Sequence, residues 1–346
     1  MGKKKKIPSI NPYLSTPTRK RDRPDIQELF KGIKAGNWQH LSRAITLVES
    51  RSAQDNVSAK ELIKLCLPLS GKSFRMGITG SPGVGKSTFI EALGVQLIEA
   101  GHKVAVLAID PSSSINKGSI LGDKTRMDRL SSHPHSFVRP SPAGDSLGGV
   151  ARTTRESIIL CEAAGYDRII IETVGVGQSE IAVHSMTDFF LLLLLPGGGD
   201  ELQGIKRGIM EMADLILINK ADGEREAIAK KSKRMVQNAL HILPPEDKIW
   251  TPPVETISAL KQKNLDVVMA IIRKYQQLAT KEGLLEDKRK QQSAFWLEES
   301  INYQLKNFFF QNPKIKERYK TLKSDVLSNK ITPFEAADEL FRTFVN

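Results

Sequence analysis

The residues best suited to chemistry lie in a glycine-rich segment that follows an apolar run and precedes an amphipathic helix pattern. It consists of Gly80, Ser81, Pro82, Gly83, Val84, Gly85, Lys86, Ser87 and Thr88. The first eight fit G-x-x-x-x-G-K-[ST], in which backbone N–H groups surround phosphates at the positive end of a helix. We expect Lys86 to bridge the β- and γ-phosphates of a nucleoside triphosphate and the Ser87 hydroxyl to coordinate Mg²⁺.

A second group of residues is suited to reading the base. Its members are Asn219, Lys220, Ala221 and Asp222, which match N-K-x-D at the end of an apolar run. The Asp222 carboxylate can accept hydrogen bonds from N1–H and the exocyclic amine of guanine, whereas adenine offers no matching pair of donors. An accessory segment that resembles the base-supporting loop of GTPases follows, with Ser258, Ala259 and Leu260. The order of the three segments predicts GTP or GDP as the ligand.

Acidic residues between these segments are candidates for the metal site and for hydrolysis. Asp110 ends the second predicted strand, and Glu172 ends the third at a position where a D-x-x-G loop normally places aspartate. A glutamate reaches one methylene farther and can bind Mg²⁺ or its waters. Asp123 lies in a segment suited to be a switch, although its spacing fits a solvated loop acid equally well. We take Lys86 and Glu172 as the catalytic residues.

The residue that follows this loop predicts slow turnover. Val176 occupies the position where Ras-like GTPases carry the glutamine that orients the attacking water. A hydrophobic side chain cannot orient water, so intrinsic hydrolysis should be slow and depend on another element or a partner.

The elements that must position these residues read as an α/β fold. Short Ile/Leu/Val runs separated by helix-length connections predict a mostly parallel sheet covered by helices on both faces, as in P-loop NTPases. The expected strands are Phe74–Thr79, Val104–Asp110, Arg168–Glu172, Phe189–Leu195, Leu215–Asn219 and a short edge strand near Ile249–Ile257. We divide the chain into a basic disordered tail (1–25), an N-terminal helical extension (26–70), a GTPase domain (71–282) and a C-terminal helical dimerisation region (283–346).

The C-terminal region has exposed apolar faces. Leu297, Ile301, Leu305 and Phe308 recur at helical spacing, and the segment Thr332–Glu335 predicts a capped helix start with proline at its first position. Three short helices with this much Leu and Phe need a partner surface, which is either the core domain or a second copy of the chain.

Composition excludes several classes of protein. The 346 residues are 40% hydrophobic and 26% charged, as in ordinary globular proteins, and no apolar run approaches the ~18 residues that span a membrane. Of the net charge of +12, residues 1–23 contribute +7, from eight Lys/Arg and one acid. We interpret this tail as solvated, because no nucleic-acid recognition motif follows it. Cys66 and Cys161 fit buried thiols in a reducing cytosol.

Five further blocks closely resemble the MeaB/ArgK family of GTPase chaperones, which serve adenosylcobalamin-dependent acyl-CoA mutases, chiefly methylmalonyl-CoA mutase. The blocks are Ile109–Ser113, Ile120–Asp123, Leu147–Arg152, Glu172–Glu180 and Gly199–Lys206. The resemblance covers about residues 75–260. It implies a homodimer, a cytoplasmic location (the mitochondrial matrix in a eukaryote), and Mg²⁺ held through Ser87 with Asp110, Asp123 and Glu172 as ligands or close neighbours.

The resemblance also implies that the loop Gly197–Lys206 is an extra switch that relays the nucleotide state to the mutase, with Asp200, Glu201 and Lys206 as its working residues. Composition alone favours a solvated, charged loop there. The segment Ser114–Ser119 departs from the family, which more often has a Phe-Thr-Gly-Gly-like turn. This difference changes the expected detail of the switch around these residues, whereas the flanking acids Asp110 and Asp123 are both present.

Two other readings remain open. The family's older ArgK label suggests a metabolite or protein kinase, although Asp222 favours guanine and no acceptor pocket is evident. A nickel-type metallochaperone GTPase would want a His-rich tail or a Cys/His cluster, whereas the tail here is rich in lysine.

Overall fold

A seven-stranded parallel sheet forms the centre of the computed structural model, which describes residues 25–50, 52–109, 127–140, 147–173, 179–197, 207–242 and 249–345. The strands are β1 (Phe74–Gly80), β2 (Val104–Ile109), β3 (Ser136–Arg139), β4 (Arg168–Thr173), β5 (Phe189–Leu194), β6 (Leu215–Ile218) and β7 (Val254–Thr256). Their order is β3-β2-β4-β1-β5-β6-β7, and every adjacent pair is parallel. All carboxyl ends therefore meet at one edge of the sheet, where α/β proteins bind ligands.

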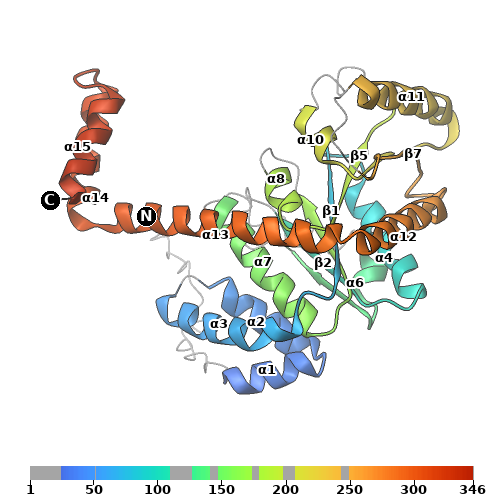
Figure 1. Ribbon diagram of the computed structural model, residues 1–346, viewed down its shortest axis with the longest axis horizontal. Helices are drawn as coiled ribbons and strands as arrows, with labels where there is room; N and C mark the ends of the chain where they lie inside the picture. The colour runs from blue at the N-terminus through green and yellow to red at the C-terminus, as the bar shows by residue number, and fades with distance from the viewer. Residues whose placement is uncertain are drawn as a thin grey trace, which may run out of the picture.

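Helices cover both faces of this sheet (Figure 1). They are α4 (Lys86–Glu99), α6 (Asp128–Ser131), α7 (Leu147–Ala163), α8 (Ser179–His184), α10 (Arg207–Met212), α11 (Glu226–Ile242) and α12 (Leu265–Lys281). The strands are apolar on both sides, and successive residues go to opposite layers. Val104 and Val106 pack in the cluster of α4 and α12, whereas Ala105 and Leu107 pack in the cluster of α7 and α8. The predicted fold class is confirmed.

The N-terminal helices share the core of the second layer. They are α1 (Ile26–Lys34), α2 (Trp38–Val48) and α3 (Ala53–Cys66). Asp25 and Asn37 cap the first two by accepting hydrogen bonds from Gln27 N at 2.8 Å and from Gln39 N at 2.9 Å. Their apolar faces join α7 in one cluster, which also contains the buried thiols of Cys66 and Cys161.

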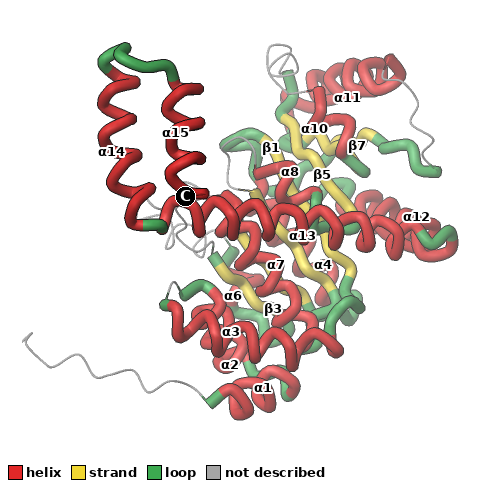
Figure 2. Tube along the Cα trace, turned by 60° about the vertical axis from the view of Figure 1, so that its left-hand side comes forward, coloured by secondary structure: helices red, strands yellow, loops and turns green. Residues whose placement is uncertain are grey.

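The C-terminal part of the chain forms an arm. It consists of α13 (Leu284–Gln311), α14 (Pro313–Leu327) and α15 (Pro333–Val345). In Figure 1, α13 crosses the domain and carries the other two away from it, and Figure 2 shows α14 and α15 side by side as a hairpin. Pro313 ends α13, and the Asn312 side chain caps α14 by accepting from Lys314 N at 3.0 Å. The first of the three helices is thus 28 residues long, and the expectation of three short helices is wrong at this point.

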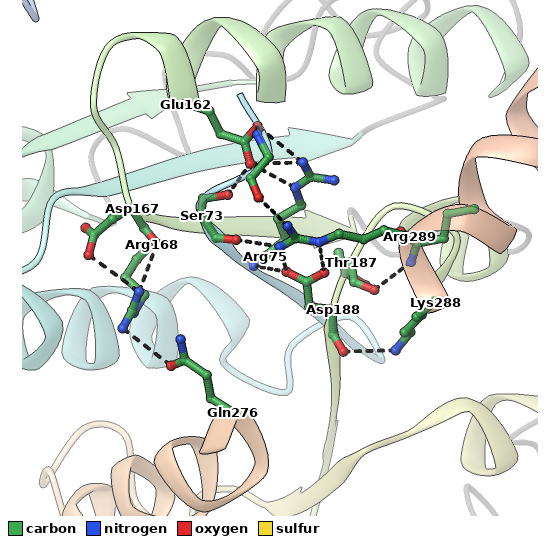
Figure 3. Close-up of polar contacts among 12 residues, drawn as sticks. Ser73, Arg75, Glu162, Asp167, Arg168, Thr187, Asp188, Gln276, Lys288 and Arg289 are labelled. Atoms are coloured by element: carbon green, nitrogen blue, oxygen red, sulfur yellow. Dashed lines mark hydrogen bonds and ion pairs between the residues drawn. The ribbon is translucent and has the colours of Figure 1, made fainter. Parts of the chain in front are cut away.

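A buried polar network fastens the arm to the amino-terminal edge of the sheet (Figure 3). Arg289 of α13 forms a two-pronged ion pair with Asp188, with Nε to Oδ1 at 2.8 Å and Nη2 to Oδ2 at 2.6 Å. Next to it, Glu162 of α7 accepts from Arg75 of β1 at 2.9 Å and from the Ser73 hydroxyl at 2.5 Å. Breaking a buried pair of this kind costs about 3–5 kcal/mol, because it leaves one charge unpaired. The base of α13 is therefore fixed to the domain.

Most predicted elements are present, with two differences in the sheet. The edge strand predicted near Ile249–Ile257 is the three-residue β7. Strand β3 is not predicted, because its four residues are too few to make a pattern and only Phe137 among them is buried. No helix of the described residues is long and apolar enough to cross a membrane.

Candidate functional site

The glycine-rich segment forms a tight loop between β1 and α4 at the carboxyl edge of the sheet. Gly80, Gly83 and Gly85 have φ angles of 152°, 79° and 96°, in the region that favours glycine. A side chain at Gly85 would place its Cβ 2.8 Å from Asn219 Nδ2. Both the backbone conformation and the close approach of Asn219 therefore require glycine at this position.

The Lys86 ammonium lies across this loop. Its Nζ donates to the Gly80 carbonyl at 2.7 Å and to the Ser81 carbonyl at 3.3 Å, and the residue is buried. Burial lowers the pKa of Lys86, while the nearby carboxylates of Glu172 and Glu180 oppose that shift. The two carbonyls hold the charge at the loop, where it can meet a phosphate anion.

The start of α4 supplies further donors for an anion. Gly85 occupies the N-cap position, and no side chain caps the helix there. The first N–H groups of a helix have no acceptor within it, and they carry the positive end of the helix dipole. Phosphate oxygens are the natural partners for such donors.

Ser87 and Glu172 lie together beside the loop. The Ser87 hydroxyl donates to Glu172 Oε1 at 3.4 Å, and Glu172 is buried at the end of β4. Hydroxyl and carboxylate oxygens are ligands that Mg²⁺ accepts, and Mg²⁺ normally needs one or two carboxylates besides phosphate and water. The two side chains fit that donor set. The described residues contain no group of three or more metal-binding side chains, and Asp110 and Asp123, the other two predicted ligands, lie outside the described residues.

The segment predicted to read guanine follows β6 on the same edge of the sheet. Asp222 accepts a hydrogen bond from the Ser258 hydroxyl, and this hydroxyl also accepts from Lys261 N at 3.2 Å. The chain reaches Asp222 through Lys220, which has a positive φ of 59°. Ser258 thus orients the carboxylate that is predicted to bind guanine. Leu260 is 75% exposed at the outer end of the accessory segment.

Asn219 joins the phosphate loop to the base-reading loops. Its buried amide donates from Nδ2 to the Val84 carbonyl at 2.8 Å and accepts at Oδ1 from Ala259 N at 3.1 Å. The amide therefore uses both of its functional ends inside the protein. Sequence reasoning assigned Asn219 to the nucleotide site without this bridging role, which only the three-dimensional contacts reveal.

Some site residues were not singled out from the sequence. Thr79 and Thr173 share a buried hydrogen bond of 2.9 Å between their hydroxyls, which joins the ends of β1 and β4. Glu180 of α8 acts electrostatically on Lys86. In the sequence, Thr173 and Glu180 appear only as members of a family block, and Thr79 appears only as the end of a predicted strand. Val176, Asp200, Glu201 and Lys206 lie outside the described residues.

Comparison with known proteins identifies the family. The family model described as "Methylmalonyl Co-A mutase-associated GTPase MeaB" matches residues 41–314, well over half of the chain. The chain belongs to the MeaB family. It is therefore a P-loop GTPase that binds guanine nucleotide, in agreement with the loop at Gly80 and the Asp222 segment.

Relatives of this MeaB-family chain carry several names. It is 44% identical to "Methylmalonic aciduria type A homolog, mitochondrial" of Mus musculus, over 92% of this chain and 79% of that one. It is also 44% identical to "GTPase ArgK" of Escherichia coli, over 89% of this chain and 93% of that one. Among solved structures it is similar to "LAO/AO transport system kinase", with a TM-score of 0.74 and 36% identity, covering 93% and 98% of the two chains.

Proposed function

We propose that this GTPase is a chaperone of an adenosylcobalamin-dependent acyl-CoA mutase, with methylmalonyl-CoA mutase as the client. In this function the GTP cycle gates loading of the cofactor and protects the enzyme. One observation carries the proposal: the family match runs from α2 through the sheet and along all of α13. The similarity therefore extends beyond the nucleotide-binding elements that all P-loop GTPases share. The name of the mouse relative supports the same client.

We assign the steps of hydrolysis to the residues gathered at the loop. Lys86 binds the β- and γ-phosphates, and the N–H groups at the start of α4 bind the remaining phosphate oxygens. Ser87, Glu172 and the predicted ligands Asp110 and Asp123 would hold Mg²⁺, which when bound neutralises the charge on the phosphates. Val176 cannot orient water, so we expect slow turnover until a partner supplies that group.

Glu172→Gln tests the assignment of the metal. The amide keeps the shape of the side chain but loses the negative charge, so the Mg²⁺ concentration needed for half-maximal hydrolysis should rise by about 10–100-fold, the usual effect of weakening a metal shell. A magnesium titration of the hydrolysis rate measures this. Glu156→Gln, on α7 and paired only with Arg152 in the described contacts, is the control and should leave the titration unchanged. An unchanged titration for Glu172→Gln would remove this residue from the metal site.

We propose further that the α14–α15 hairpin binds a second copy of the chain. The four buried side chains of its own core are Ile315, Leu322, Ala336 and Leu340. Leu322, Ala336 and Leu340 also line an apolar groove of about 750 Å³, together with aromatic side chains that include Phe308 and Phe341. These two phenylalanines are 70% and 64% exposed, which is costly for an isolated monomer. A second hairpin presents the same apolar surface and can cover the groove symmetrically.

Phe341→Asp should convert the dimer to a monomer, because it replaces an apolar side chain that lines the groove by a charged one. Phe334→Asp is the matched control, since Phe334 is 82% exposed on the same helix and does not line the groove. Sedimentation velocity of both variants gives the oligomeric state. Monomeric wild-type protein, or a dimer that survives Phe341→Asp, would contradict the assignment.

Co-elution tests the proposed client. The chain is mixed with methylmalonyl-CoA mutase and chromatographed with GDP or with a non-hydrolysable GTP analogue. We expect a complex whose amount depends on the nucleotide, and stimulation of GTP hydrolysis by the mutase. Lys206→Ala should keep basal hydrolysis and lose most of the stimulation. Equal stimulation of variant and wild type would refute the relay role of the Gly197–Lys206 loop, and transfer of phosphate from GTP to arginine instead of water would favour the kinase reading.

A further inference from the structure

The short connection between α8 and β5 is held by side chains of α13. Trp296 donates from Nε1 to the Ser185 carbonyl at 3.0 Å. Gln292, one turn earlier on the helix, donates from Nε2 to the carbonyls of Thr187 at 2.8 Å and His184 at 3.3 Å. The His184 carbonyl ends α8 and also accepts from Thr187 N at 3.4 Å, and the carbonyls of Ser185 and Thr187 lie just beyond the helix. The arm therefore caps α8.

The next residue of the connection is held from the same side. The Asp188 carboxylate is fully buried and receives both prongs of Arg289 (Figure 3). Its backbone carbonyl accepts from Lys288 Nζ at 3.0 Å and from Tyr275 of α12 at 3.0 Å. Arg75 N donates to the Asp188 carboxylate at 2.8 Å, which joins the group to β1. The arm thus holds the connection at Ser185, Thr187 and Asp188.

The connection between α8 and β5 lies between two segments that were predicted to respond to the nucleotide. Helix α8 begins six residues after Thr173, so it is the first element after the Glu172 loop. Strand β5 leads in the other direction to Gly197, the start of the predicted extra switch. In GTPases, segments that contact the γ-phosphate change their arrangement after hydrolysis. The connection lies between α8, which follows the Glu172 loop, and β5, which leads to the predicted extra switch, and α13 holds it.

The buried polar side chain of Gln292 indicates a role in hydrogen bonding rather than in packing alone. The side chain is buried, and its Oε1 has no hydrogen-bond partner among the described residues. A buried acceptor without a partner is unfavourable, and an apolar side chain would avoid that cost. From the other side, Arg155 of α7 donates to the Gln292 carbonyl at 3.1 Å and lies over the Trp296 ring at 5.7 Å. Gln292 thus links three helices: it belongs to α13, its carbonyl accepts from Arg155 of α7, and its side chain donates to the end of α8.

We propose that Gln292 and Arg289 are positioning residues that couple α8 to the arm, so that the nucleotide state sets the packing of α13. The proposal rests on the GTP cycle of the proposed function. Coupling between two sites is reciprocal, so a change in α13 must also change the relative affinity of the site for GTP and GDP. This reciprocity gives the proposal two independent readouts.

Gln292→Leu removes the two hydrogen bonds that the Gln292 side chain donates, and the leucine side chain fills a similar volume. Gln291→Leu, on the exposed side of the same turn, is the matched control. Hydrogen exchange is measured on the full chain with GDP and with a non-hydrolysable GTP analogue. In wild type and Gln291→Leu, amides of α8 and of residues 284–300 should exchange at rates that differ between the two states by about fivefold or more, the lower end of typical coupling. In Gln292→Leu the difference should disappear from residues 284–300 and remain in α8.

Affinity measurements give the second readout. In Gln292→Leu, the ratio of the affinities for the GTP analogue and for GDP should change. The factor of this change should equal the factor by which the difference in α13 exchange between the two nucleotide states falls. In Gln291→Leu, the affinity ratio should stay constant. If Gln292→Leu does not fold, Arg289→Lys takes its place, because a lysine keeps the charge and loses the two-pronged geometry. Identical α13 exchange in both nucleotide states of the wild type, or an unchanged difference in the variant, overturns the proposal. The test uses only the chain and nucleotide, so failure to bind a mutase leaves it intact.

Discussion

Asp222→Asn should weaken binding of GTP and GDP and create binding of xanthosine nucleotides. Asp222 is expected to accept two hydrogen bonds from guanine, and a hydrogen bond to a charged group contributes about 1.5–3 kcal/mol. The amide oxygen of asparagine can still accept from N1–H, but the hydrogen bond to the exocyclic amine is lost. Loss of that one bond corresponds to about 10–10²-fold in affinity, since 1.4 kcal/mol is tenfold. Xanthine carries an oxygen where guanine carries its exocyclic amine, so the amide of the substituted side chain would find an acceptor there. Titration with fluorescent guanosine and xanthosine diphosphates measures both affinities.

Asp266→Asn is the control for this substitution. Asp266 lies exposed in the first turn of α12, and the change of charge and size is the same. It should leave both affinities within about twofold, because exposed charges away from a site have small effects. If Asp222→Asn bound GDP as tightly as the wild type does, the assignment of the base-reading carboxylate would be wrong.

Lys86→Ala should reduce GTP hydrolysis by about 10²–10³-fold, the usual cost of removing one donor that stabilises charge in a transition state. The ammonium is already held over the loop by the carbonyls of Gly80 and Ser81. No reorganisation is then needed when charge develops on the β- and γ-phosphates. Single-turnover hydrolysis with the nucleotide at saturation separates this effect from weaker binding.

The control for Lys86→Ala is Lys274→Ala, which removes an exposed lysine from α12. It should hydrolyse GTP at the wild-type rate. Thermal unfolding of both variants checks that the loop has not collapsed, since Lys86 also bonds the backbone of the loop. Hydrolysis that survived Lys86→Ala would move the catalytic charge to another residue.

Much of the fold could be predicted because the parallel strands are continuous apolar runs. Strand β5 was predicted as Phe189–Leu195 and is Phe189–Leu194, buried at every position, so its place in the interior of the sheet follows from its apolar sequence. Strand β3 lies at the edge of the sheet, has one buried residue and is four residues long, so no periodic pattern can develop. An edge strand has one neighbour in the sheet, which for β3 is β2, and a window of four residues does not show that pairing.

The phosphate loop and the base-reading segment could be placed because each is a contiguous motif whose backbone geometry needs particular residues. The contacts between the motifs could not be predicted. Asn219 joins Val84 and Ala259 across long stretches of chain, and nothing local marks it for that role. The same holds for Arg289, whose partner Asp188 is 101 residues away. In the sequence it belongs to a charged run that resembles a solvated helix face.

The two cysteines have a practical consequence for measuring motion of the arm. Burial raises the pKa of Cys66 to about 11 and raises the pKa of Cys161 as well, so neither thiol ionises near neutral pH. Both are enclosed between the N-terminal helices and α7, where maleimide reagents cannot reach them. A single cysteine introduced at Ser328, in the turn after α14, would then react selectively in the otherwise native protein. In the proposed dimer, fluorescent dyes attached there would report the distance between the two arms without prior removal of the native thiols.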